Sequence, residues 1–145
     1  MKLASGPDAL KFALAGNARL TLVSTKTGTR FTFRIKAKDV RKDEAASPPW
    51  FVSLLNGREN DRDYTFLGTI FDDRVTYRHG RRSEVSPDAP SAKGFAWAWS
   101  FLAKAELPPG CEVWHEGRCG RCGRALTVPE SIAMGLGPEC ADGGY

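Results

Sequence analysis

The residues of this sequence that are best suited to chemistry are soft metal ligands near its C-terminal end. His115 lies four positions before Cys119, two residues separate Cys119 from Cys122, and seventeen separate Cys122 from Cys140. One imidazole and three thiolates at such intervals can surround a tetrahedral zinc ion, and zinc binding can fold a segment too small to have a core of its own. The sequence therefore predicts a Zn²⁺ site formed by His115, Cys119, Cys122 and Cys140.

The spacing leaves the fourth ligand open between two residues. Cys111, eight positions before Cys119, is the alternative to His115. Glycine follows both Cys119 and Cys122, which lets the backbone turn tightly and direct amide N–H groups at the sulfurs. Four protein ligands fill a tetrahedral shell and leave no position for substrate, so we expect a structural zinc site rather than a catalytic one.

Residues 119–140 resemble a small zinc-finger-like family of unknown function that is abundant in proteins of bacteriophages and bacterial mobile elements. The blocks Cys-x2-Cys-Gly-Arg, Leu-Thr-x-Pro-x-Ser-Ile and Gly-x-Gly-Pro-x-Cys stand here in order, and His115 reproduces a histidine that the family often carries. The resemblance covers about the last quarter of the chain and implies zinc binding and a phage-associated origin, but no activity. The preceding 110 residues resemble the front half of similar phage proteins without a named role.

The elements that must position these ligands are mainly strands. Alternating apolar and polar residues bounded by turn residues predict five strands, at residues 18–24, 30–38, 50–55, 64–71 and 75–78. Because successive strands are joined by short turns, we expect an α+β fold: a five-stranded antiparallel sheet or small barrel with a packed helix and a C-terminal zinc-knuckle module.

Two helices are expected, a short one at residues 7–15 and a longer one at 92–106. The longer helix has one apolar stripe that includes Phe95 and Trp99, and a second stripe formed by Trp97 and Phe101. A helix that is apolar around so much of its girth has two neighbours. We therefore expect a β-rich basic domain at residues 1–106 and a zinc-binding module at 111–145 that covers the second stripe.

The positive charge of the chain is concentrated in its first third. The formal net charge is +4, and residues 1–45 hold ten Lys or Arg against four Asp or Glu. Such an excess favours an anionic partner, although a solvated strand face also carries these residue types. The cationic side chains that we propose for nucleic-acid binding lie on the predicted strand face and in a second basic cluster: Arg19, Arg30, Arg34, Lys36, Lys38, Arg78, Arg81 and Arg82.

Three classes of function follow from these features. The first is an accessory protein that binds nucleic acid. Single strands are candidate ligands, because Trp50, Tyr64 and Tyr77 are available to stack on unpaired bases. The second is a non-catalytic protein-binding module that acts on a host protein complex, for example in defence. An enzyme is not expected, because the sequence has no glycine-rich phosphate loop and no Ser/His/Asp set. We therefore expect no small-molecule substrate.

The compartment is expected to be the cytoplasm, that of the bacterial host if the protein is phage-encoded. The first residues contain no apolar stretch typical of a secretory signal, and no run approaches the roughly 20 apolar residues that span a bilayer. A reducing compartment favours metal binding or free thiols over disulfides for the four cysteines.

Overall fold

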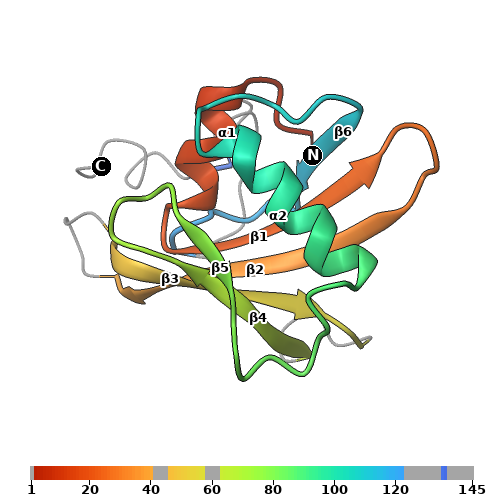
Figure 1. Ribbon diagram of the computed structural model, residues 1–145. Helices are drawn as coiled ribbons and strands as arrows, with labels where there is room; N and C mark the ends of the chain where they lie inside the picture. The colour runs from red at the N-terminus through yellow and green to blue at the C-terminus, as the bar shows by residue number, and fades with distance from the viewer. Residues whose placement is uncertain (1, 41–45, 58–62, 123–134, 137–145) are drawn as a thin grey trace.

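The protein folds into a six-stranded antiparallel sheet with two helices packed on one of its faces (Figure 1). The computed structural model describes residues 2–40, 46–57, 63–122 and 135–136, and the statements below concern these residues. The spatial order of the strands is β5-β4-β3-β2-β1-β6. In chain order the elements are α1 (Gly6–Ala13), β1 (Asn17–Ser24), β2 (Arg30–Asp39), β3 (Ser47–Leu55), β4 (Tyr64–Ile70), β5 (Tyr77–His79), α2 (Pro90–Leu102) and β6 (Cys111–His115).

The predicted α+β class and antiparallel sheet are confirmed. The predicted number of five strands was wrong, and so was the alternative of a small barrel. β5 and β6 are the two edges of an open sheet, so the described strands form no barrel. The sixth strand is β6, which pairs with β1 from Leu20↔His115 to Ser24↔Cys111. Residues 111–115, which we had assigned to the zinc-binding module, are therefore part of the main sheet. The pairing with β1 supplies the hydrogen bonds that hold this short strand.

The inner face of the sheet, which meets the helices, follows from the alternation of the strands. Phe33 and Ile35 of β2 are fully buried, and their partners across the sheet, Leu20, Ala18 and Val52, are buried as well. Phe95 of α2 packs its ring 4.9 Å from that of Phe33, measured between centroids. The core therefore lies in one layer between this face and the helices.

Helix α2 ends four residues before the predicted end at residue 106. Residues 103–105 form a turn in which Ala105 has a φ of 58°, a left-handed conformation that a helix cannot continue through. Phe95 and Trp99 are buried as predicted. Trp97, by contrast, is 45% exposed, so the expected cover over the second stripe was wrong for this residue. It makes an edge contact with Phe101 at 5.3 Å between ring centroids.

Helix α1 (Gly6–Ala13) covers the β1–β6 end of the same sheet face. The Ser5 side chain accepts a hydrogen bond from the Asp8 N–H and caps its first turn. Trp50 of β3 donates from Nε1 to the Leu14 carbonyl at 3.2 Å, which fixes the C-terminal end of the helix to the sheet. The Phe12 ring of α1 is buried, and Gly120 and Gly135 of the C-terminal segment lie close against it.

Neither described helix has the length and apolar character needed to cross a membrane.

Candidate functional sites

The outer face of the sheet, opposite the helices, carries the predicted cationic side chains of the strands. Residues paired across neighbouring strands point to the same side of a sheet. Arg19 of β1 lies opposite Arg34 of β2, and Lys36 of β2 lies beside Phe51 of β3. The row that contains Lys36 and Phe51 continues through Thr69 to Arg78 on the edge strand. Four predicted cations from three strands are thus brought to one surface.

Exposed aromatic rings lie among these cations, and they are not the rings that the sequence suggested. Phe51 is 40% exposed in the row between Lys36 and Thr69, and Trp114 is 37% exposed opposite Thr21. Of the aromatics named from the sequence, Trp50 is buried and belongs to the inner face. We call Arg19, Arg34, Lys36, Arg78, Phe51 and Trp114 the outer-face patch.

Two further predicted aromatics are accounted for by packing. Tyr77 is on the inner face, with its ring 4.8 Å from that of Phe95. Burial raises the pKa of the Tyr77 phenol, and its hydroxyl has no hydrogen-bond partner among the described residues. Tyr64 is half-buried, and the guanidinium carbon of Arg34 lies 4.7 Å from the centroid of its ring. This cation–π contact holds the Arg34 side chain in place on the outer face.

The remaining predicted cations lie at the margins of the sheet. Arg30 and Lys38 are exposed near the two ends of β2, on the outward side of its alternating pattern. Arg81 and Arg82 are exposed in the turn that follows β5. An acid that also lies on the outer side, Glu112, is already paired with Lys2 at 3.3 Å.

The segment predicted to form a zinc knuckle begins directly after β6, and its described residues pack against α1. The Gly120 carbonyl accepts a hydrogen bond from the Asn17 N–H at 2.7 Å, and the Gly120 N–H donates to the Gly135 carbonyl at 2.8 Å. A Cβ on Gly120 would lie 2.7 Å from the Phe12 ring, so only glycine allows this approach. These contacts place the segment at the start of β1.

Cys119 has surroundings that suit a metal-bound thiolate. Its side chain is buried, and the Arg121 N–H donates to the sulfur at 3.4 Å. Backbone N–H groups directed at sulfur are typical of zinc knuckles, because they stabilise the negative charge of the thiolate. Gly120, which lies between Cys119 and Arg121, therefore has the role that the sequence predicted for it, and Gly123 lies outside the described residues.

His115 lies near the same place but is differently engaged. It is 3% exposed, and its ring is 5.6 Å from that of Phe12. Its Nδ1 accepts a hydrogen bond from the Gly117 N–H at 2.9 Å. A neutral imidazole that accepts at Nδ1 carries its proton on Nε2, and a protonated nitrogen cannot bind zinc. His115 can therefore act as a zinc ligand only after its bond to Gly117 is broken.

The described residues do not assemble the full predicted ligand set. Cys122 is exposed, Cys140 lies outside the described residues, and no three His, Cys, Asp or Glu side chains of the described part of the chain gather closely enough to hold a metal. His115 and Cys119 are thus brought to the Phe12 region without forming a complete site with Cys122.

Cys111, the alternative ligand, lies at the other end of the sheet. It pairs with Ser24 at the end of β1, whereas the knuckle is bonded to Asn17 at the start of that strand. Seven residues of extended strand separate these ends by roughly 23 Å, at about 3.3 Å a residue. A ligand must reach within about 2.3 Å of zinc. In this fold Cys111 cannot share a metal ion with Cys119.

The site and fold define an open-faced α+β protein with a cysteine-rich C-terminal segment. Residues 114–143 are similar to a family described as a family of unknown function, DUF6011. This stretch includes all four predicted zinc ligands, and the family description gives no activity. No curated protein and no solved structure matches the chain.

Proposed function

We propose that the protein binds single-stranded nucleic acid on the outer face of its sheet. The observation that carries the proposal is the outer-face patch itself, in which strand register interleaves Arg19, Arg34 and Lys36 with the exposed ring of Phe51. Cationic side chains attract the phosphate backbone, and exposed rings stack on bases that a duplex would hide. Sheet surfaces that combine both are a recurrent way of binding single strands.

The packing of the patch also supports this proposal over a merely solvated face. Arg19 and Arg34 are direct cross-strand neighbours, an arrangement of like charges that destabilises a sheet. In our proposal one phosphate of the bound strand contacts both guanidinium groups of this pair. The Arg34 guanidinium is fixed against Tyr64, and its buried Nε–H has no hydrogen-bond partner among the described residues. A fixed guanidinium loses little side-chain entropy when it binds a phosphate.

The C-terminal segment would stabilise this sheet through a structural zinc ion. In our proposal Cys119, Cys122 and Cys140 supply three ligands, and His115 supplies the fourth once it releases Gly117. Support comes from the N–H bond of Arg121 to the Cys119 sulfur and from the contact of the segment with Phe12 and Asn17. Zinc has no catalytic part in this scheme.

Fluorescence anisotropy with a labelled 15-nucleotide oligo-dT, the matching RNA and a DNA duplex tests the proposal. We expect saturable binding to the single strands, weaker binding to the duplex, and a loss of about 1–3 kcal/mol of binding free energy for Phe51→Ala. The matched control is Trp97→Ala, which removes a similarly exposed aromatic from the helix side of the protein. Equal effects of the two substitutions, or no binding by the wild type, would contradict the proposal.

A protein partner is the second candidate, and the exposed ring of Trp97, which rests against the half-buried ring of Phe101, favours it. Exposed aromatic side chains are frequent anchors of protein interfaces. If the wild type binds no oligonucleotide but retains one defined host protein in a pull-down, and Trp97→Ala abolishes that retention, the second candidate replaces the first.

A further inference from the structure

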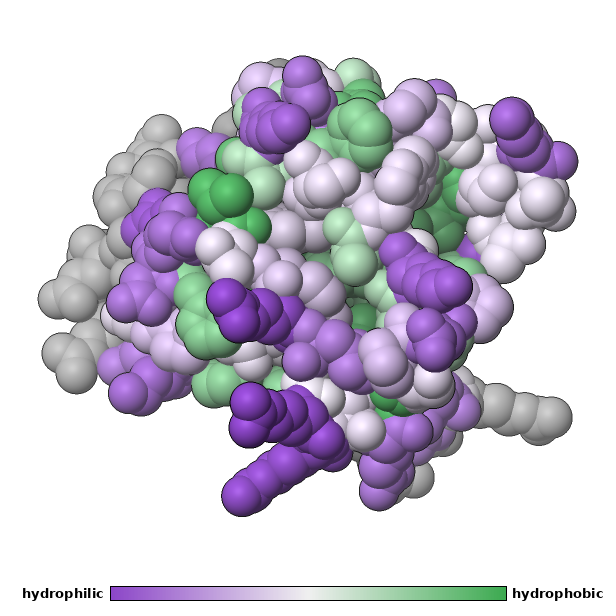
Figure 2. All heavy atoms as spheres, viewed as in Figure 1, coloured by the Kyte–Doolittle hydropathy of each residue, from purple (hydrophilic) through white to green (hydrophobic). Residues whose placement is uncertain are grey.

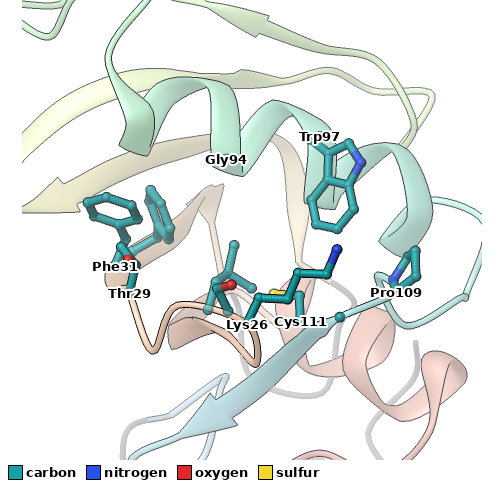
Figure 3. A pocket seen from close by; sticks show the side chains of 11 residues that line it. Lys26, Thr29, Phe31, Gly94, Trp97, Pro109 and Cys111 are labelled. Carbon is teal, nitrogen blue, oxygen red and sulfur yellow. The ribbon is translucent and has the colours of Figure 1, made fainter.

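A hollow with a volume of about 340 Å³ opens on the helix side of the sheet, away from the outer-face patch (Figure 3). It lies between the β1–β2 hairpin, α2 and the start of β6. Leu22 and Phe33 are buried at its base, and Phe31 is half-buried beside them. Trp97 points into it from α2, and Cys111 faces it from β6. The space-filling view shows apolar side chains inside a hollow on this side of the molecule (Figure 2).

The walls of the hollow are held in place by hydrogen bonds between distant parts of the chain. The N–H and the Oγ1 of Thr25, in the hairpin turn, both donate to the Gly110 carbonyl, at 2.9 and 3.1 Å. The next residue, Cys111, is paired with Ser24 in the sheet. The hairpin and the segment before β6 are therefore joined at the rim, so the hollow exists before any ligand binds.

Gly94 of α2 keeps the hollow open at a cost to the helix. A glycine inside a helix is less stable than alanine by about 1 kcal/mol. Packing does not require it here, because a Cβ on Gly94 would have no atom within 4 Å apart from those of its own helix and its chain neighbours. It lines the hollow one turn before Trp97. A side chain at this position would extend into the hollow, which gives a reason for its absence.

The charge at the rim is positive. Lys26 extends from the hairpin across the mouth, with its ammonium group toward Trp97 (Figure 3). Lys26 has no ion-pair partner among the described residues, and none of the residues that line the hollow is acidic. Desolvation raises the pKa of the Cys111 thiol, so the sulfur adds no negative charge of its own. A ligand with an anionic end would therefore find one unpaired cation above an apolar base.

From this geometry we propose that the hollow is a binding site for a compact apolar molecule bearing one carboxylate. The apolar part, aromatic or branched aliphatic, would lie against Phe31, Phe33 and Leu22, beneath the Trp97 ring. The carboxylate would pair with the Lys26 ammonium at the rim. The volume is at the lower end of the roughly 300–1,000 Å³ found for small-molecule sites, which restricts the ligand to about the size of a two-ring aromatic acid.

The test is a titration of the full-length, zinc-supplemented protein with naphthalene-2-carboxylate, followed by backbone amide NMR shifts. We expect saturable shifts centred on Gly94, Gly110 and the Lys26 turn. Gly94→Leu should fill the hollow and weaken binding at least tenfold. Gly94→Ala, which adds only one methyl group, and Ala96→Leu, which adds the same bulk at an exposed position of α2, should bind within about twofold of the wild type.

The role of charge is tested with Lys26→Met and the uncharged analogue 2-naphthalenemethanol. We expect Lys26→Met to weaken carboxylate binding several-fold and to leave the binding of the alcohol unchanged. The site is disproved if the shifts do not saturate, if they centre elsewhere, or if Gly94→Leu binds as the wild type does. The carboxylate class is disproved if acid and alcohol bind equally well to both the wild type and Lys26→Met.

Discussion

Removal of two positive charges from the outer face, by Lys36→Gln and Arg78→Gln together, is expected to weaken the binding of single-stranded oligonucleotides in a salt-dependent way. Both side chains are exposed and belong to the row that runs through Phe51 and Thr69. They can therefore be replaced without disturbing the core. Arg34 is left intact, because its contact with Tyr64 would make a loss of binding hard to separate from a loss of packing.

The magnitude follows from counterion release. Each phosphate contact of a single strand contributes about 0.7 to the slope of log K against log salt concentration, so two lost contacts lower the slope by about 1.4. With the affinity at 1 M salt unchanged, binding at 0.1 M falls about 25-fold, whereas binding at 0.5 M falls only about threefold. An anisotropy titration at five salt concentrations measures both the slope and the affinity.

The matched control is the double variant Lys93→Gln and Lys104→Gln. It also lowers the formal net charge of +4 by two, but its exposed lysines lie in α2 and just after it, on the helix side. Charges beyond the Debye length, about 10 Å at 0.1 M salt, are largely screened, so we expect a change of less than about twofold. If both double variants lower the slope equally, the protein attracts oligonucleotides only through its net charge. An unchanged slope in the outer-face variant would refute the reasoning directly.

Three further predictions concern stability and metal binding. Tyr77→Phe should raise the free energy of unfolding by about 1 kcal/mol in urea, because it removes a buried hydroxyl that has no partner among the described residues. Burial keeps the Tyr77 phenol neutral in the folded protein, whereas in the unfolded chain it ionises above about pH 10. The wild type should therefore lose stability as the pH rises above about 10, and Tyr77→Phe should lose less. Equal losses of stability in the two proteins would contradict this. Gly120→Ala should lower the free energy of unfolding by about 1–3 kcal/mol, because its Cβ would press on the Phe12 ring; unchanged urea unfolding would show that the ring moves aside at no cost. Native mass spectrometry should find one zinc per chain in the wild type and in Cys111→Ser but none in Cys119→Ser, and equal metal content in the two variants would exclude the proposed ligand set.

The sequence correctly predicted which residues lie on the outer face wherever the alternation within one strand was enough to decide it. In β2, apolar residues alternate with polar, mostly cationic ones from residue 30 to residue 38. Because one face must be buried, Phe33 and Ile35 could only point inward. The cations Arg34 and Lys36 then had to point outward. The position of Arg19 beside them needed only the short hairpin that joins β1 to β2, which fixes which residues pair.

The features that the sequence missed depend on pairing between distant segments. β6 has five residues and one aliphatic side chain, Val113, so its own pattern could not reveal a strand beside the predicted zinc ligands. Its pairing with β1, about ninety positions earlier, makes it one, and exposes Trp114 on the outer face. The ligand hollow was missed for the same reason, because Lys26, Trp97 and Cys111 come from three separate parts of the chain.

Phe51 shows why composition alone could not separate a solvated face from a binding face. In β3, Trp50, Phe51 and Val52 form an apolar run, a pattern that is typical of an internal strand buried on both faces. The strand is indeed internal to the sheet, yet only Trp50 and Val52 are buried, while Phe51 is exposed between Lys36 and Thr69. A face that needed only solvation would be served better by threonine or serine at this position.

In our proposal the exposed part of the Phe51 ring is the surface on which a base stacks. Its cross-strand neighbour Lys36 is a cation, which disfavours a role at the centre of an apolar protein interface, because the buried core of such interfaces is depleted of charge. A base stacked on the ring, with its phosphate beside the ammonium, satisfies both side chains at once. The juxtaposition of a ring and a cation on an open sheet, rather than either one alone, is what favours nucleic acid over a protein partner on this face.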